Sequence, residues 1–324
     1  MRRARRWFTV AVIVLGSATF FYLLWSFGPL RVWDLFRGFG WGFAVLLPFQ
    51  YLDHMLNATG WRLAFTPAQA KQVSFWELVR VRIAGDGVNY LTPSASIAGE
   101  FVRPGMLRSS LPHDAKVSSV VVAKATQAAG QGLFVLLGLI YLINARLYDF
   151  KDGQAGWAAA GISAMLCGVA VGLGLLAARP PERLIARFPA AFAKLEPLRR
   201  SLREFLGRHP IRLVGSIFFF MLGYAWGAAE MWLICRFLGV PIGPETALGI
   251  EFLSNLVDAF AFMVPAKIGT QEAGKAVIFK GLGLGADVGF TAGLIRHTRE
   301  LLWAALGLGL YAAHQREAAA KTRG

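Results

Sequence analysis

The sequence predicts an all-α, polytopic membrane protein with about six spanning helices and two re-entrant helical hairpins in inverted-topology repeats. The first observation behind this prediction is composition. Of the 324 residues, 56% are hydrophobic and 16% are charged, and the mean hydropathy is +0.49; soluble domains usually contain about 25% charged residues. The second observation is the grouping of basic residues between apolar runs, and the third is a polar pattern that occurs twice.

Several apolar runs have about 20 residues or more, which is enough to cross the hydrocarbon core of a bilayer as a helix. The first run follows the basic N-terminus MRRARRW and is longer than the apolar core of a signal peptide, so it is expected to stay as an anchor. The predicted spans are residues 7–27, 39–61, 117–143, 157–178, 211–237 and 288–312.

Basic residues gather at the N-terminus, between the second and third spans, between the fourth and fifth spans, and in the C-terminal tail. With an even number of crossings as predicted, these zones all fall on one side of the membrane, which the positive-inside rule identifies as the cytoplasm. Both termini are therefore predicted to be cytoplasmic. The same zones produce the net charge of +15, and their position between apolar runs argues against nucleic-acid binding.

Two segments, residues 74–111 and 245–283, are too long for tight turns and mix apolar residues with proline, glycine and charge. Each is predicted to be a re-entrant hairpin, in which two short helices enter the membrane and return to the same side. In the second segment, Pro265 and Gly269 interrupt the helix. Thr270 is expected to cap the half-helix that follows.

The two hairpin segments carry the same polar pattern 172 residues apart, without a gap. The pattern is an aspartate, a proline, a glutamate and a base, followed by a second base in the next span. Asp86, Pro93, Glu100, Arg103 and Lys124 correspond to Asp258, Pro265, Glu272, Lys275 and Arg296. Because the preceding spans run in opposite directions, the two repeat units, about residues 39–144 and 211–313, are predicted to be inverted.

The whole chain, residues 1–324, is predicted to form a single integral-membrane domain, because no segment is long enough to bury a separate soluble core. A basic connector at about residues 179–210 joins the two repeat units. Apolar residues recur in it at helical spacing. This pattern fits either a helix lying on an anionic leaflet or a plain cytoplasmic connector.

Charged residues at membrane depth indicate function, because an isolated charge at mid-bilayer costs about 2.5–3.5 kcal/mol. Arg296 and Arg299 lie on one face of the last span, and two guanidinium groups placed in this way suit a phosphate. The alternative is structural: the acids and bases pair with one another and hold the broken helices together.

The sequence contains no P-loop, no HExxH motif and no GxSxG motif. Cys167 and Cys235 lie inside apolar runs and are interpreted as small hydrophobic residues. His54 and His297 lack the spacing of metal ligands. The protein is therefore not expected to be an enzyme, and neither a cofactor nor a metal is expected.

Three stretches resemble the lysylphosphatidylglycerol synthase transmembrane family, whose flippase-like membrane region also occurs in the multiple peptide resistance factor. They are NATGWRL at 57–63, NYLTPSASIAGEFVR at 89–103 and VPAKIGTQEAG at 264–274. Ala98 stands where the family often has a glycine, and Ala266 and Lys267 replace its usual small residues. The ending IRHTRELLWAALGL at 295–308 is similar to the hopanoid-biosynthesis-associated branch.

The resemblance implies lipid handling rather than lysyl transfer, because no stretch resembles the soluble aminoacyl-transferring domain of the full synthase. By motif position, it also implies functional roles for Gly99 and Gly269. The complete set of predicted substrate-binding residues is Asp86, Pro93, Gly99, Glu100, Arg103, Lys124, Asp258, Pro265, Gly269, Glu272, Lys275, Arg296 and Arg299.

The leading hypothesis is a flippase or transporter that moves a phospholipid or other polar lipid across the bacterial inner membrane, with the headgroup bound between the two hairpins. The alternatives are a membrane-embedded transferase acting on lipid headgroups, and a non-transporting scaffold for lipid or hopanoid biosynthesis enzymes. The predicted partners are membrane lipids with anionic or zwitterionic headgroups. The sequence is compatible with homo-oligomers and with complexes that contain lipid-biosynthesis enzymes.

Overall fold

The computed structural model describes residues 20–91, 98–144, 189–260, 267 and 269–321, together with scattered residues between 156 and 183. Pro93 and Pro265 lie outside the described residues, as do most of the first and fourth predicted spans. The helices are α2 (Pro29–Phe39), α3 (Gly42–Leu63), α4 (Pro67–Ala70), α5 (Phe75–Leu91), α6 (Ala98–Met106), α7 (His113–Asn144), α10 (Pro189–Arg208), α11 (Pro210–Phe237), α12 (Pro244–Phe260), α13 (Thr270–Gly281) and α14 (Ala286–Lys321).

Among the described helices, α7 and α11 are long and apolar enough to cross a membrane by length and composition. They coincide with the predicted spans at 117–143 and 211–237. Helices α3 and α14 cover the predicted spans at 39–61 and 288–312 but are more polar. Both bury polar side chains, such as Asn57 on α3 and Arg296 on α14.

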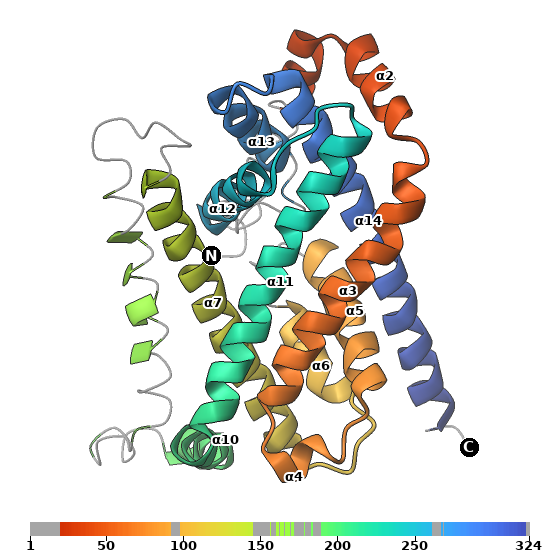
Figure 1. Ribbon diagram of the computed structural model, residues 1–324. Helices are drawn as coiled ribbons and strands as arrows, with labels where there is room; N and C mark the ends of the chain where they lie inside the picture. Colours follow the sequence, from red (N-terminus) through yellow and green to blue (C-terminus); the bar gives the residue numbers. More distant parts are fainter. Residues whose placement is uncertain are drawn as a thin grey trace.

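The four long helices α3, α7, α11 and α14 run along the length of the molecule, and short helices fill each half (Figure 1). Helices α5 and α6 lie in the half that contains α4 and α10, whereas α12 and α13 lie in the opposite half. Helix α3 packs against α11 and runs in the opposite direction. Helix α14 packs against α5 in one half and against α13 in the other.

Glycines let these helices approach backbone to backbone, as small residues commonly do in membrane proteins. A Cβ atom added to Gly99 on α6 would lie 2.1 Å from the carbonyl oxygen of Gly85 on α5. A Cβ atom on Gly307 of α14 would lie 2.2 Å from the carbonyl oxygen of Ile83. Larger side chains at these positions would separate α5 from both of its neighbours.

Large apolar side chains lie exposed on the outer surface, and charged side chains lie in the interior beside the hydrophobic core. Trp41, Phe101 and Ile211 are each more than four-fifths exposed, whereas Arg103 and Glu272 are buried. This distribution suits a protein surrounded by lipid, in which ionisable side chains face the interior of the helix bundle.

The sequence did not predict α2, which lies at the end of the molecule opposite α4 and α10 (Figure 1). Gly28 precedes it with φ 85°, a conformation that glycine adopts without strain. Pro29 then occupies the first helical position, where a missing N–H costs nothing. Arg31 ties α2 to α14 through an ion pair with Asp287 at 2.6 Å.

Candidate functional site

A polar chamber of about 450 Å³ lies between the two halves of the molecule. It is lined from α5, α6, α7, α11, α12, α14 and the segment between α12 and α13. The lining residues are Asp86, Asn89, Tyr90, Glu100, Lys124, Gln127, Ala128, Gln131, Tyr224, Asn255, Asp258, Lys267 and Glu300. The structure therefore brings four predicted site residues, Asp86, Glu100, Lys124 and Asp258, to one chamber.

A second cavity of about 210 Å³ shares Gln127, Tyr224, Asn255, Asp258 and Glu300 with the chamber. Arg296 and Arg299, the predicted phosphate ligands, line this second cavity rather than the chamber itself. Six predicted site residues are thus divided between two adjoining cavities, whereas five others line neither of them: Gly99, Arg103, Gly269, Glu272 and Lys275.

In the first half, Arg103 connects the two helices of the α5–α6 pair. Its Nη2 atom lies 2.6 Å from Oδ1 of Asp86, and its Nη1 atom donates to Glu100. Glu100 also pairs with Lys124 on α7, with 3.4 Å between Nζ and Oε1. The pairing of Glu100 with bases agrees with the sequence hypothesis. Asn89 adds a further tie, because its Oδ1 accepts a hydrogen bond of 2.6 Å from the backbone N–H of Gly99.

In the second half, Asp258 pairs with Lys267, with 2.6 Å between Nζ and Oδ2. Lys267 has φ 53°, the one positive φ of a non-glycine residue in the described part of the chain. Residues other than glycine, asparagine and aspartate rarely adopt this conformation, so Lys267 holds its ammonium group in the chamber at a cost in backbone strain.

The start of α13 differs from the prediction. Gly269, not Thr270, is the N-cap residue, and Oε2 of Glu272 accepts a hydrogen bond of 3.0 Å from its backbone N–H. The hydroxyl of Thr270 instead donates to the carbonyl oxygen of Lys267. Glu272 is fully buried, and its other oxygen lies 2.5 Å from Nδ1 of His297. Glu272 therefore meets a histidine and not the bases that the sequence hypothesis gave it.

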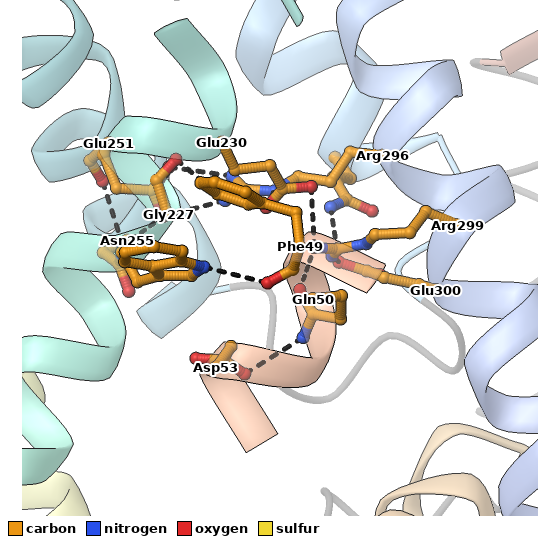
Figure 2. Close-up of polar contacts among 12 residues, drawn as sticks. Phe49, Gln50, Asp53, Gly227, Glu230, Glu251, Asn255, Arg296, Arg299 and Glu300 are labelled. Atoms are coloured by element: carbon orange, nitrogen blue, oxygen red, sulfur yellow. Dashed lines mark hydrogen bonds and ion pairs between the residues drawn. The ribbon is translucent and has the colours of Figure 1, made fainter. Parts of the chain in front are cut away.

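Arg296 and Arg299 are surrounded by protein carboxylates (Figure 2). Arg296 lies 2.9 Å from Glu251 on α12 and 3.1 Å from Glu230 on α11. Arg299 contacts the other oxygen of Glu230 at 2.6 Å, Glu300 at 3.2 Å and the side-chain oxygen of Gln50. In this conformation a phosphate would have to displace these carboxylates before it could bind either guanidinium group.

Lys275, the counterpart of Arg103 in the repeat, is buried and makes no ion pair with any described residue. The pattern of the repeat therefore recurs in sequence but not in contacts. Substrate binding by Lys275, Arg296 and Arg299 stays a prediction.

A family model described as the lysylphosphatidylglycerol synthase TM region matches residues 7–309. The chain belongs to this family. Membership establishes a helical, lipid-related membrane protein, in agreement with the resemblance found in the sequence. The comparisons with curated proteins and with solved structures found no match. The likeness to the hopanoid-associated branch stays a prediction.

Sequence reasoning missed two site residues of this lysylphosphatidylglycerol synthase TM region. Glu251 is an isolated acid in the apolar part of α12, and this position could have marked it as the partner of a buried base. Lys267 stands where the family usually has a small residue, and the sequence motif does not include it in the site. The positive φ that makes Lys267 unusual is visible only in the structure.

Proposed function

We propose that the protein moves a polar lipid across the inner membrane of a bacterium, with the lipid headgroup held in the chamber between the two hairpins. The observation that carries this proposal is the polar chamber, lined from both halves, inside an apolar exterior. A headgroup is polar and its acyl chains are apolar, so a lipid matches both environments at once. Intramembrane charges that face a shared cavity are typical of substrate pathways.

Inverted repeats with broken helices are a transporter architecture in which substrate binds where the repeats meet. The opposite directions of α3 and α11, and the opposite placement of the two short-helix pairs, support this architecture. Helices α4 and α10 and the C-terminal end of α14 lie at one end of the molecule, where the basic residues gather. On the proposed topology of about six spans, this end is cytoplasmic.

Within the chamber, we propose Lys124 and Lys267 as the groups that meet a lipid phosphate. Their side chains are 42% and 31% exposed, whereas those of Arg296 and Arg299 are 9% and 5% exposed. Replacing a carboxylate by a phosphate keeps each ammonium group paired, and Glu100 keeps Arg103 when Lys124 binds the phosphate. The buried arginines are then structural ties, and the two lysines are the exchangeable contacts.

Purified protein in liposomes, with a fluorescent phospholipid analogue, tests the proposal. The Lys124→Gln and Lys267→Gln variants are each expected to slow lipid movement about 10-fold or more, because a charged hydrogen bond contributes about 1.5–3 kcal/mol. Lys280→Gln is the matched control, since Lys280 is an exposed lysine at the end of α13. Parent rates in both chamber variants would contradict the assignment of the lysines. A parent rate no faster than that of protein-free liposomes would contradict lipid movement itself.

The two alternatives predict different outcomes in a deletion strain. If the protein is a headgroup transferase, its deletion changes the chemical composition of the lipids but not their distribution between the two leaflets. A scaffold keeps its function when the chamber lysines are replaced and loses it when the surface of residues 179–209 is altered. A flippase changes lipid sidedness and depends on the chamber lysines.

A further inference from the structure

A third cavity, of about 170 Å³, lies between α3, α5 and α14 beside the chamber. It shares Asp86, Tyr90 and Glu300 with the chamber, and it shares Arg299 with the second cavity. It thus adjoins both cavities that contain predicted site residues. His54 of α3 and Trp303 of α14 also line it.

Several residues that line this third cavity carry buried polar atoms without hydrogen-bond partners among the described residues. Neither ring nitrogen of His54 has a hydrogen-bond partner among the described residues, and the same holds for Nε of Arg299 and Nε1 of Trp303. His54 is 5% exposed and Arg299 is 4% exposed, so bulk solvent does not satisfy these atoms. Buried polar groups in proteins are nearly always hydrogen-bonded to protein or to water.

Water fits the cavity by size and by chemistry. At roughly 30 Å³ for each molecule, a volume of about 170 Å³ holds a small cluster. The Nε–H of Arg299 and the Nε1–H of Trp303 are donors, and the side chains of Asp86 and Glu300 supply acceptors in the same lining. A water cluster satisfies both kinds of group, whereas an apolar ligand satisfies neither.

Among the ionisable residues that line the cavity, the side chains of His54 and Tyr90 make no hydrogen bond with a described residue, and of these two the His54 ring is the base. The nearest carboxylate is that of Asp86, with 3.7 Å between Nδ1 and Oδ2. Two other charged groups do not line this cavity. Lys124 on α7 pairs with Glu100, and Glu230 on α11 pairs with Arg299. The charged groups that face His54 are Asp53 on α3, Arg82 and Asp86 on α5, Arg103 on α6, and Arg299 and Glu300 on α14.

We infer that the third cavity holds a water cluster and that His54 is a proton-binding site which couples proton movement to lipid movement. The coupling rests on the proposed function. In the step itself, a proton from the water cluster binds a ring nitrogen of neutral His54 and forms the imidazolium. Release of that proton to water restores the neutral ring, so no other reactant is consumed.

Proton binding at His54 acts on the first hairpin through Asp86. Asp86 also holds Arg103 at 2.6 Å, and this contact joins α5 to α6 beside the chamber. An imidazolium at His54 attracts the same carboxylate and competes with Arg103 for it. The ion pair between the two helices weakens, and the wall of the chamber that contains Glu100 becomes easier to move.

Liposomes with a trapped pH-sensitive dye and a fluorescent phospholipid measure both movements in one preparation. In the parent protein, an imposed pH gradient is expected to change the rate of lipid movement, and lipid movement is expected to carry protons. His54→Gln should lower the proton flux about 10-fold or more and remove the response to the gradient. The control is His113→Gln, an exposed histidine at the start of α7, which should behave as the parent.

Trp303→Phe keeps the inference testable if His54→Gln does not fold. It removes the unpartnered indole N–H of this lining residue but keeps an aromatic ring beside Tyr51, whose ring centroid lies 6.1 Å away. A proton flux below that of the parent supports the water cluster, and a parent flux overturns it.

The two proposals fail in different ways in this experiment. If lipid moves but the proton flux is the same with and without His54, the proton-binding site is overturned and the proposed function stands. If protons move through His54 but lipid does not, the proposed function is overturned and the proton-binding site stands.

Discussion

The two hairpins share a polar pattern in sequence but use it in different ways. In the α5–α6 pair, Arg103 joins both helices through Asp86 and Glu100, so the charges are balanced within the hairpin and by Lys124. In the α12–α13 pair, Asp258 is balanced by Lys267 of the same segment, but the two buried acids are balanced by another element. Glu272 meets His297 of α14, and Glu251 meets Arg296 of the same helix.

This difference shows that a sequence motif can occur twice while its residues make different contacts in each copy. Both hairpins contain an ion pair of their own, Arg103 with Asp86 in the first and Lys267 with Asp258 in the second, but the buried acids Glu251 and Glu272 of the second hairpin find their bases on α14. Helix α14 is therefore the main support of the second hairpin, and it also packs against α5 of the first. Substitutions in α14 should disturb the molecule more than equivalent substitutions in the first hairpin.

The largest effect is expected from Arg296→Leu. This change leaves Glu251 buried without its base, although Glu230 keeps Arg299 at 2.6 Å, and breaking a buried ion pair in this way typically costs about 3–5 kcal/mol. Thermal unfolding and size-exclusion chromatography in detergent measure the loss. Arg236→Leu is the control, because Arg236 is exposed at the end of α11. Equal stability of the two variants would show that Arg296 does not support the second hairpin.

Arg103→Leu should cost less, about 2–3 kcal/mol, although it also removes a base shared by two carboxylates. Asp86 keeps Arg82 at 3.6 Å, and Glu100 keeps Lys124 at 3.4 Å, so neither carboxylate is left without a base nearby. The same unfolding measurement applies. A loss as large as that of Arg296→Leu would mean that the remaining bases do not compensate and that the two halves do not differ in this respect.

Gly99→Ala and Gly274→Ala compare how tightly the two hairpins are closed. An added Cβ at Gly99 meets a backbone oxygen at 2.1 Å, which cannot move aside, and overpacking of this kind typically costs about 1–3 kcal/mol. At Gly274 the Cβ meets a methyl carbon of Val257 at 2.9 Å, which can shift slightly. The unfolding midpoint should fall more for Gly99→Ala. The reverse order would show that the second hairpin is the more tightly packed one.

The smallest effect concerns Lys267, which has no counterpart of the same kind in the first hairpin. Lys267→Gly and Lys267→Ala both remove the ion pair with Asp258, but alanine keeps the unfavourable positive φ. The glycine variant is expected to be more stable than the alanine variant by about 1 kcal/mol. Identical unfolding midpoints would contradict the strained backbone at residue 267.

Much of the fold could be predicted from the sequence, because long apolar runs have few alternatives to helices in a membrane. Helices α7 and α11 agree with their predicted spans within a few residues, and the two predicted hairpin segments contain α5 and α6 and then α12 and α13. The short helices α2 and α4 were missed. Runs of about 20 apolar residues indicate spanning helices, and helices as short as α2 and α4 do not produce such runs.

The site could be predicted where the residues in contact lie close together in the sequence. Arg103 and Glu100 are three residues apart on one helix, and Asp86 is 17 residues away across a single break, so the repeat motif was enough to group them. The two lysines of the chamber were predictable in part. Lys124 belongs to the motif, whereas Lys267 is marked by its positive φ, which only the structure shows.

The sequence by itself determined a helical membrane protein of this family, with charges concentrated in two related segments. Only the tertiary structure decided which charges meet. Arg296 is 66 residues from Glu230 and 45 from Glu251, and Glu272 is 25 residues from His297. Such partners depend on how each helix is rotated and how deeply it sits against its neighbours. Helix packing settles both, through side chains that have no regular spacing in the chain.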